Sequence, residues 1–367
     1  MNQQYNNFLK LKSESGFHSP SVYELINDMG VDIKIDGCFL CNPHAFDLYM
    51  DYYNNTDLTN YMKYYPPQNK ILAKKLSKAL NLNSDYVLIG NGAIQLIELI
   101  LKEYTNKLKC IITPTFSTYY EIDSENIEYF ILDKEDGFRI EVENLINFCK
   151  EKSIEVLVLV NPNNPTGTTL TKFEINRIVK ALNIKVIVDE SFIDFYDKTQ
   201  TVEEEVYANS NLIVIRSLSK DFGIAGLRLG YAVISPFLKS KIISKYGLCW
   251  NINGLAHFFI ETINNLDFFK KYKIARDTYL ADRDIFLNQL STLKTFKVYA
   301  SKANFFILDC FENAEKVFSE LLFEHKIYTR ILNDKLHLEP SFLRIACGTK
   351  ENNTNIFNAL TKIENKL

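Results

Sequence analysis

Short apolar runs alternate with amphipathic stretches through the middle of the chain. The runs are rich in valine and isoleucine and end at turn residues, which predicts buried strands. Strands are expected at 110–114, 128–133, 155–160, 185–191 and 212–220, and helices at 92–104, 142–152 and 173–182. Apolar strands that alternate with helices are typical of a mostly parallel sheet with helices on both faces.

The last third of the chain follows a different order. A helix ending near residue 293 precedes strands at 296–300 and 304–310, a helix at 314–325, a strand near 342–347 and a last helix at 351–366. This order predicts a smaller α+β unit. We therefore expect an α/β protein with a large domain, 46–250, and a small domain, 1–45 with 251–367, divided inside a long helix near residue 250.

Composition narrows the class of protein. The chain has 367 residues, of which 47% are hydrophobic and 24% charged, with a net charge of −3. This balance predicts two globular cores, and without a basic stripe we expect no nucleic-acid partner. No apolar run reaches the ~18 residues of a membrane span, and the start lacks the apolar core of a signal peptide. We expect a cytoplasmic protein that meets no membrane.

The seven cysteines are scattered and odd in number, which is typical of a reduced chain. Cys38 and Cys41 form a lone CxxC motif. The motif has either a redox or metal-binding role, or it is part of a short apolar strand without such a role. Because no second such pair or histidine cluster accompanies them, the strand is favoured and no metal site is predicted.

Three unusual loops follow predicted strands: "NPNNPTG" at 161–167, "DESF" at 189–192 and "SLSK" at 217–220. In an open α/β sheet, ligands bind beyond the carboxyl ends of the strands. The three loops are therefore expected to open on one crevice.

A phosphate site is predicted beside this crevice. The stretch "IGNGAIQLI" runs from a strand through glycines into a helix, so the amides of Gly92, Ala93 and Ile94 are available to an anion. Two hydroxyls and a guanidinium, from Ser217, Ser219 and Arg228, complete a set suited to a phosphate dianion.

Three further residues in the loops suggest a particular cofactor. Lys220 is a candidate amine nucleophile toward an aldehyde, Asp189 a partner for a protonated pyridine nitrogen, and Asn164 a donor to a phenolate oxygen. Taken singly, each residue is better explained by an ordinary role: a helix cap for Asp189, a turn for Asn164 and a salt bridge for Arg228, with a solvated surface lysine as the alternative for Lys220. Taken together with the phosphate site, they outline pyridoxal 5′-phosphate.

The motifs "NPNNPTG", "VDES" and "SLSKDFGIAGLRLGY" resemble those of pyridoxal-phosphate enzymes with the aspartate aminotransferase fold, class I and II. The most similar groups are the histidinol-phosphate aminotransferases and the threonine-phosphate decarboxylases. The resemblance extends from "CNP" near residue 42 to "FLRIACGT" near residue 348. It implies the type I transferase fold, a homodimer with shared active sites, and a small substrate that carries phosphate, carboxylate or both.

The resemblance also implies roles for single residues. Lys220 is the Schiff-base lysine, Asp189 pairs with the pyridine nitrogen, and Asn164 contacts the phenolate oxygen beside the substrate. Phe116 stacks on the cofactor ring, and Tyr65 reaches the phosphate held by the neighbouring subunit.

For the substrate, the resemblance implies two arginines in the C-terminal part of the chain. Arg344 grips the α-carboxylate, and Arg330 binds the phosphate of phosphorylated substrates. The usual "NPxG" is "NPHA" here, which departs from the family pattern.

A further departure bears on the reaction. Phe192 stands where aminotransferases of this group carry a tyrosine, and threonine-phosphate decarboxylases resemble this chain there. The first hypothesis is an aminotransferase that moves an amino group from glutamate to a small phosphorylated carbonyl compound. The alternative is a decarboxylase of O-phosphothreonine or O-phosphoserine. A noncatalytic regulator on the same fold is a third hypothesis, disfavoured because no DNA-binding segment precedes the motifs.

Overall fold

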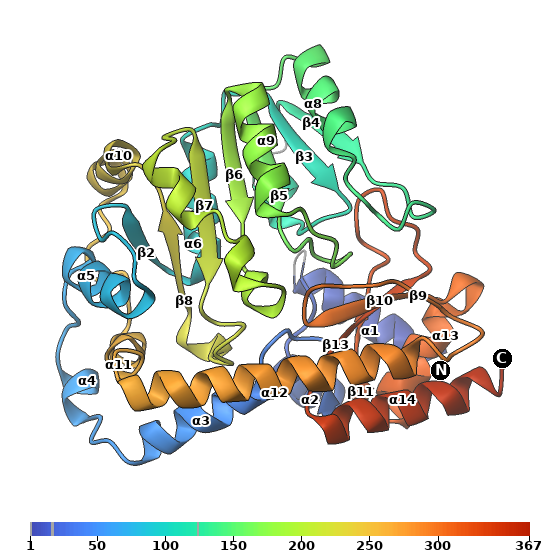
Figure 1. The fold of residues 1–367 in the computed structure, drawn as a ribbon. Helices are drawn as coiled ribbons and strands as arrows, with labels where there is room; N and C mark the ends of the chain where they lie inside the picture. Colours follow the sequence, from blue (N-terminus) through green and yellow to red (C-terminus); the bar gives the residue numbers. More distant parts are fainter. Residues whose placement is uncertain (1, 16–17, 123–124) are drawn as a thin grey trace.

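A seven-stranded sheet forms the centre of the computed structural model, which describes residues 2–15, 18–122 and 125–367 (Figure 1). The strand order is β2-β8-β7-β6-β5-β3-β4. Only β8 runs antiparallel to its neighbours, so the sheet is mostly parallel and the α/β class is confirmed. Its strands are β2 (Val87–Asn91), β3 (Lys109–Thr113), β4 (Ile127–Ile131), β5 (Val156–Val160), β6 (Lys185–Asp189), β7 (Leu212–Ser217) and β8 (Leu229–Val233).

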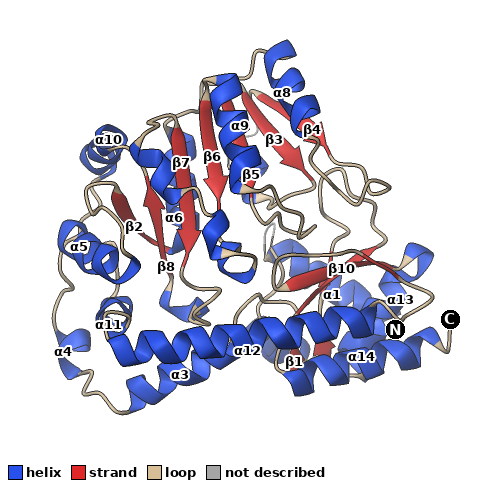
Figure 2. Cartoon of the chain, in the orientation of Figure 1, coloured by secondary structure: helices blue, strands red, loops and turns tan. Residues whose placement is uncertain are grey.

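Helices cover both faces of this sheet (Figure 2). Side chains alternate along each strand, so Leu157 packs into the core beneath α5, α8 and α9, whereas Val156 and Val158 pack beneath α6 and α10. This arrangement explains why the strands read as continuous apolar runs. The helices are α5 (Asn69–Leu80), α6 (Gly92–Lys102), α7 (Thr118–Glu121), α8 (Val142–Glu151), α9 (Lys172–Leu182), α10 (Pro236–Tyr246) and α11 (Gly254–Thr262).

A smaller antiparallel sheet, ordered β12-β13-β10-β9, lies below the large one in Figure 1. A two-stranded parallel pair, β1 with β11, lies beside it. The N-terminal helices share its apolar core, where Phe8 of α1 packs on Phe318 of α13 with ring centres 4.6 Å apart. The elements are α1 (Asn2–Glu14), α2 (Val22–Met29), β1 (Ile35–Asp36), β9 (Lys297–Val298), β10 (Phe305–Asp309), α13 (Ala314–Ser319), a π-helical turn (Glu320–Glu324), β11 (Ile327–Tyr328), β12 (Arg330–Ile331), β13 (Phe342–Ala346) and α14 (Lys350–Glu364). The division into two domains at the expected boundaries stays a prediction.

The long helix α12 (Leu266–Leu290) connects the two parts and runs beneath both sheets in Figure 1. It packs against α3 (Pro43–Asn54) and α14, and α4 (Thr59–Lys63) packs on α11. Short 3₁₀ turns complete the chain at Ile193–Phe195, Lys198–Gln200, Glu203–Tyr207, Ala225–Leu227 and Phe311–Asn313.

Two expectations about local structure are wrong. Residue 250 does not lie in a long helix, because Gly247 ends α10 in a left-handed conformation and Asn253 caps the start of α11. The CxxC segment is not a strand, because the Asp36 carboxylate accepts hydrogen bonds from the backbone N–H groups of Cys38 and Phe39 and turns the chain after β1.

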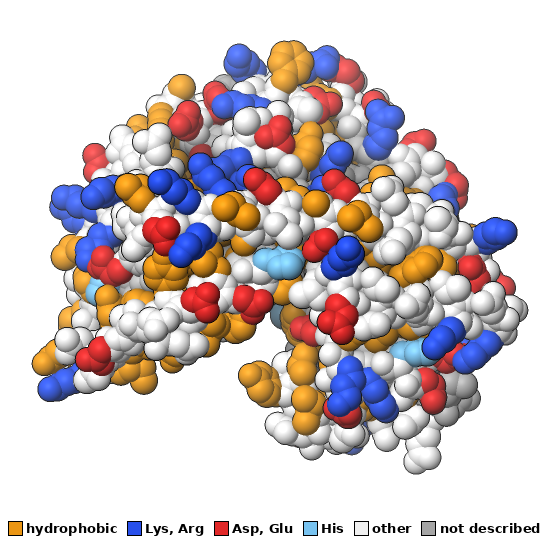
Figure 3. Space-filling model, turned by 60° about the horizontal axis from the view of Figure 1, so that its bottom comes forward, with side chains coloured by type: hydrophobic (Ala, Val, Ile, Leu, Met, Phe, Trp, Pro, Cys, Tyr) orange, Lys and Arg blue, Asp and Glu red, His pale blue; other side chains and the backbone are white. Residues whose placement is uncertain are grey.

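The surface carries charges of both signs, interspersed on the face drawn in Figure 3. In the part of the chain that the structure describes, no helix is long and apolar enough to cross a membrane. Across the same residues, no group of three or more histidine, cysteine, aspartate or glutamate side chains is placed to hold a metal ion.

Candidate active site

A cavity of about 120 Å³ lies at the carboxyl ends of β5, β6 and β7, as the three loops predict. It brings together eight predicted residues: Ala93, Ile94, Phe116, Asn164, Asp189, Ser217, Lys220 and Arg228. Ile97, Val160, Ser191 and Phe192 complete its lining. Gly92 and Ser219 are next in the chain to the lining residues Ala93 and Lys220, whereas Tyr65, Arg330 and Arg344 do not line the cavity.

One end of the cavity is built to hold an anion. Gly92 begins α6 with φ of 71°, and a Cβ atom there would lie 2.5 Å from Arg228 Nη2. Glycine therefore lets the guanidinium lie against the first turn of the helix, where free N–H groups favour negative charge. Among the described residues, the Arg228 guanidinium has no carboxylate partner and donates only to the Ala225 carbonyl, at 3.0 Å.

Two serines of β7 and its following loop flank this end. The Ser217 hydroxyl oxygen accepts a hydrogen bond from the Ser219 backbone N–H at 3.3 Å and lines the cavity. The buried Ser219 hydroxyl lies 3.4 Å from the Leu229 carbonyl, a long contact. Both hydroxyls are thus close to the Arg228 end and only weakly engaged within the protein.

Asp189 ends β6 as a buried carboxylate without a cation bonded to it among the described residues. Its Oδ2 accepts from the Tyr119 hydroxyl and its Oδ1 from the Ser191 N–H, both at 2.9 Å. Burial raises the pKa of Asp189, and these hydrogen bonds and Lys220 oppose the rise. A protonated ring nitrogen in the cavity supplies the missing cation. Sequence reasoning missed Tyr119, although it lies only three residues after Phe116, in the short helix α7.

Asn164 and Arg344 form a pair at the opposite side of the cavity. Arg344 Nη1 donates to Asn164 Oδ1 at 2.8 Å, and Arg344 Nη2 donates to the Cys38 carbonyl at 2.8 Å. The Asn164 amide nitrogen makes no bond to the described residues, so it can donate to a ligand oxygen. The structure thereby connects two residues that are both predicted to contact the substrate.

Lys220 follows Ser219 at the base of the cavity. Burial lowers the pKa of its ammonium; among the nearby charges, Arg344 and Arg228 also lower it and Asp189 opposes them. Its Nζ lies over the Phe192 ring, 6.0 Å from the centre. Its carbonyl accepts from the Asn42 N–H at 2.9 Å, so the segment before α3 holds the lysine backbone. The amine is thus placed in an enclosed setting that favours its neutral, nucleophilic form.

The two predicted substrate arginines stand directly opposite each other, Arg330 on β12 and Arg344 on β13. Arg330 is paired with Asp334, at 2.5 Å, but Arg344 has no acidic partner among the described residues. Burial lowers the pKa of Arg344 to about 10, and burial with Arg330 nearby lowers the pKa of Lys335 to about 7. Like charges at directly opposed positions are unfavourable, so this cluster of cations is suited to an anionic ligand.

A histidine that sequence reasoning missed lies over Phe116, the residue predicted to stack on the cofactor. The His18 and Phe116 rings are nearly parallel, at 15°, with centres 5.7 Å apart. Burial lowers the pKa of His18, and Lys335 and Arg330 act in the same direction. His18 carries no motif of its own, so only the folded chain shows that the N-terminal segment reaches the site.

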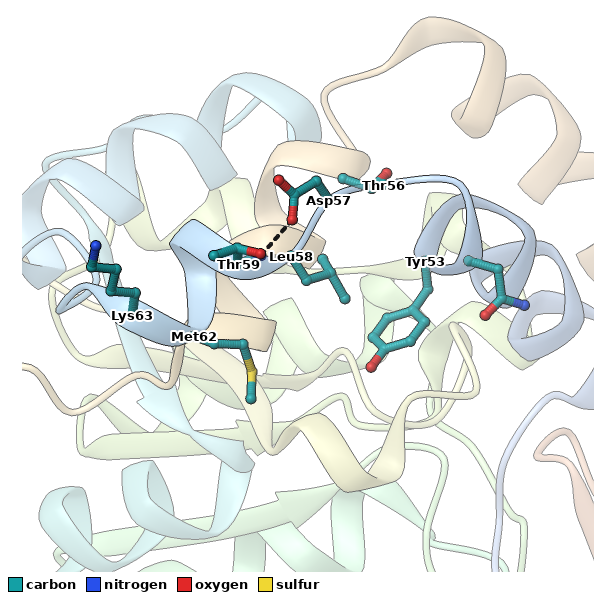
Figure 4. Close-up of a pocket in the computed structure, with 8 residues that line it drawn as sticks. Tyr53, Thr56, Asp57, Leu58, Thr59, Met62 and Lys63 are labelled. Atoms are coloured by element: carbon teal, nitrogen blue, oxygen red, sulfur yellow. Dashed lines mark hydrogen bonds between the residues drawn. The ribbon is translucent and has the colours of Figure 1, made fainter.

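Tyr65 lies outside the cavity on an exposed surface. Its ring is 80% exposed and lies 4.9 Å from the ring of Trp250, which is 51% exposed. Nearby in the chain, a shallow hollow of about 700 Å³ is lined by Tyr53, Leu58 and Met62, with the Asp57 carboxylate accepting from the Thr59 N–H at 2.9 Å (Figure 4). A single chain therefore does not bring Tyr65 to its own phosphate end.

The residues present fit pyridoxal phosphate: an anion end, a lysine, a buried carboxylate that lacks a cation and an amide donor share one cavity. Comparison with known proteins agrees. The family model for aminotransferase class I and II matches residues 49–360, and the chain belongs to this family. It has the type I fold of pyridoxal-phosphate transferases, and pyridoxal phosphate is its cofactor.

Several relatives are similar over most of the chain. An L-serine phosphate decarboxylase of Campylobacter jejuni is 35% identical over 96% of this chain and 95% of its own. A solved decarboxylase structure from Sulfurospirillum multivorans has a TM-score of 0.92 at 34% identity and covers 100% of this chain and 97% of its own. A histidinol-phosphate aminotransferase of Clostridium kluyveri is 32% identical over 80% of this chain and 82% of its own.

These relatives correct the expected reaction. The prediction of an aminotransferase with glutamate as donor is wrong, because two L-serine phosphate decarboxylases are 35% and 36% identical over 96% and 99% of this chain, compared with 32% over 80% for the histidinol-phosphate aminotransferase, and the solved decarboxylase has a TM-score of 0.92. The alternative, a decarboxylase, is the better supported class. Phe192 is the sequence feature that favours this class.

Proposed function

We propose that this protein is a pyridoxal-phosphate-dependent decarboxylase of O-phospho-L-serine. The reaction breaks the bond from Cα to the carboxylate, releases carbon dioxide and places a proton on Cα to give O-phosphoethanolamine. The observation that carries the proposal is the opposed pair Arg330 and Arg344, with Lys335 beside them and Asp334 as the bonded acid. A substrate with both a phosphate and a carboxylate supplies the negative charge that this cluster lacks.

The residues of the site have different roles in this reaction. Pyridoxal phosphate, when bound, supplies the electron sink for the bond broken at Cα. Asp189 holds the proton of the ring nitrogen, while Gly92, Ser217 and Arg228 bind the cofactor phosphate. Lys220 has a lowered pKa that suits it to move a proton at the substrate Cα.

Substrate orientation decides which bond at Cα breaks. Arg344 is fixed by Asn164 and Cys38, so a substrate carboxylate bound to it would take a set direction in the site. Arg330 and Lys335 bind the phosphate at the far end. Binding at both ends prevents the substrate from rotating about Cα.

The test is an assay of purified protein with O-phospho-L-serine and no keto acid. We expect carbon dioxide and O-phosphoethanolamine in equal amounts, and no product from a Lys220→Ala variant. O-Phospho-L-threonine in a parallel assay tests the other substrate of this class. Turnover that depends strictly on 2-oxoglutarate would refute the decarboxylase.

The proposed assembly is a homodimer in which Tyr65 of each chain reaches the phosphate end of the other. The exposure of Tyr65, Trp250 and Met62 supports this, because such a set of large apolar side chains is typical of an interface. Mixing inactive Lys220→Ala and Tyr65→Ala proteins tests it. Hybrid dimers regain one intact site, whereas separate monomers regain none.

A reducing compartment suits this chain. All seven cysteines are free thiols, and five of them are buried. Such a set is typical of the cytoplasm, where thiols remain reduced. Fractionation of cells that produce the tagged protein tests this placement.

A further inference from the structure

The residue that follows Lys220 is tied to the long helix α12. The Tyr272 hydroxyl donates to Asp221 Oδ2 at 2.7 Å, and both side chains are buried. The Tyr272 ring also stacks on Phe222, with centres 4.1 Å apart at 24°. One residue of α12 therefore contacts the two residues that come directly after the lysine.

Asp221 is an unusual hydrogen-bond partner for Tyr272, because its carboxyl is buried and only one of its oxygens is bonded. Its second oxygen, Oδ1, is buried without a hydrogen bond among the described residues. Burial and the nearby Asp194 together raise the pKa of Asp221 to about 8, although Arg216 opposes this rise. The nearby arginines stabilise the ionised form of Asp221 only weakly. Arg216 already bonds Glu203 and Asp194, and Arg276 of α12 bonds Asp277. A carboxyl in this setting holds a proton and acts as a neutral group.

We propose that Tyr272 and Asp221 are positioning residues for Lys220, through which α12 sets where the lysine amine stands in the cavity. The lysine backbone is held from one side by the Asn42 N–H, at 2.9 Å, and from the other by Tyr272 through Asp221. Asn42, which caps α3, and Tyr272 of α12 both lie outside the seven-stranded sheet. Movement of α12 thus reaches Lys220 directly, without passing through the sheet.

This inference rests on Lys220 as the cofactor lysine, but not on which substrate is used. The test is the absorbance titration of the lysine-bound cofactor, which reports the protonation of the Lys220 nitrogen without any turnover. Tyr272→Phe removes one oxygen and keeps the ring on Phe222, so the protein is expected to fold. We expect the titration midpoint to move by about half a pH unit or more and kcat to fall about tenfold with little change in KM.

Asp221 variants separate positioning from mere stability. If the carboxyl is neutral, Asp221→Asn keeps its shape and hydrogen bond and retains a midpoint near that of the wild type, whereas Asp221→Ala moves it. Tyr52→Phe is the matched control, because Tyr52 also bonds an aspartate of α12, Asp267, at 2.9 Å, but at an exposed site. The inference is overturned if Tyr272→Phe and Asp221→Ala leave the midpoint where the control leaves it, whatever happens to the melting temperature. Absence of the lysine-bound absorbance in the wild type would instead refute the proposed function.

Discussion

The Lys220 Nζ atom lies over the face of the Phe192 ring, 6.0 Å from its centre. Phe192 in turn packs edge-on against Phe305, whose ring lies 5.4 Å from the Arg344 guanidinium carbon. Two aromatic rings thus form a continuous apolar wall between Lys220 and Arg344, the arginine predicted to bind the substrate carboxylate. No hydroxyl on this wall competes for the lysine amine.

Phe192→Tyr adds a hydroxyl to this wall. We expect the decarboxylation rate to fall about tenfold, because a buried hydroxyl seeks a hydrogen bond near Lys220 and the cofactor oxygen. The measurement is kcat for O-phospho-L-serine together with any keto-acid product. Phe173→Tyr, on the exposed face of α9, is the control and is expected to have no effect. An unchanged rate would show that the ring acts only as packing.

The phosphate end of the cofactor site depends on Gly92. In Gly92→Ala, the new Cβ meets Arg228 and the residue keeps an unfavourable φ of 71°. We expect cofactor affinity to fall about tenfold or more, measured by equilibrium dialysis with pyridoxal phosphate. Gly137→Ala is the matched control, since Gly137 has φ of 66° but nothing within 4 Å of its Cβ position. Equal losses in the two variants would assign the effect to backbone strain alone.

The sequence predicts much of this site, because its motifs lie directly after the predicted strands. Strand alternation explains how Asp189 and Ser217 face the cavity while Glu190 and Arg216 face away. Tyr119, His18 and Lys335 could not be found in this way. They lie in segments without periodic pattern, and they reach the site only through packing between distant parts of the chain. The expectation of a long helix through residue 250 is wrong for a similar reason, because the caps at Gly247 and Asn253 that separate α10 from α11 carry no periodic signal.

Asp189→Asn is expected to change thermal stability in opposite ways in the cofactor-free and the cofactor-bound protein. In the cofactor-free protein, its buried carboxylate has no bonded cation, so Asp189→Asn is expected to leave thermal stability unchanged or slightly higher. With pyridoxal phosphate, the variant loses the partner of the ring nitrogen and gains less stability from the cofactor than wild type does. Melting temperatures of both proteins, with and without cofactor, measure this difference. A cofactor gain that is equal in both proteins would contradict the assignment.

The buried carboxyls of Glu190 and Asp221 lead to a prediction about pH and stability. Burial raises the pKa of Glu190 and of Asp221 to about 8 each, above the usual carboxyl range. A raised pKa means that the folded state binds the proton more tightly than the unfolded state does. The stability that these two carboxyls contribute is therefore full below about pH 4, and it is lost as the pH rises through about 8. Denaturant unfolding of the cofactor-free protein at pH 6 and pH 8.5 should therefore show a lower free energy of unfolding at the higher pH. In a Glu190→Gln, Asp221→Asn double variant, which cannot ionise at either position, this difference should shrink; a difference as large as in the wild type would place the titrating groups elsewhere.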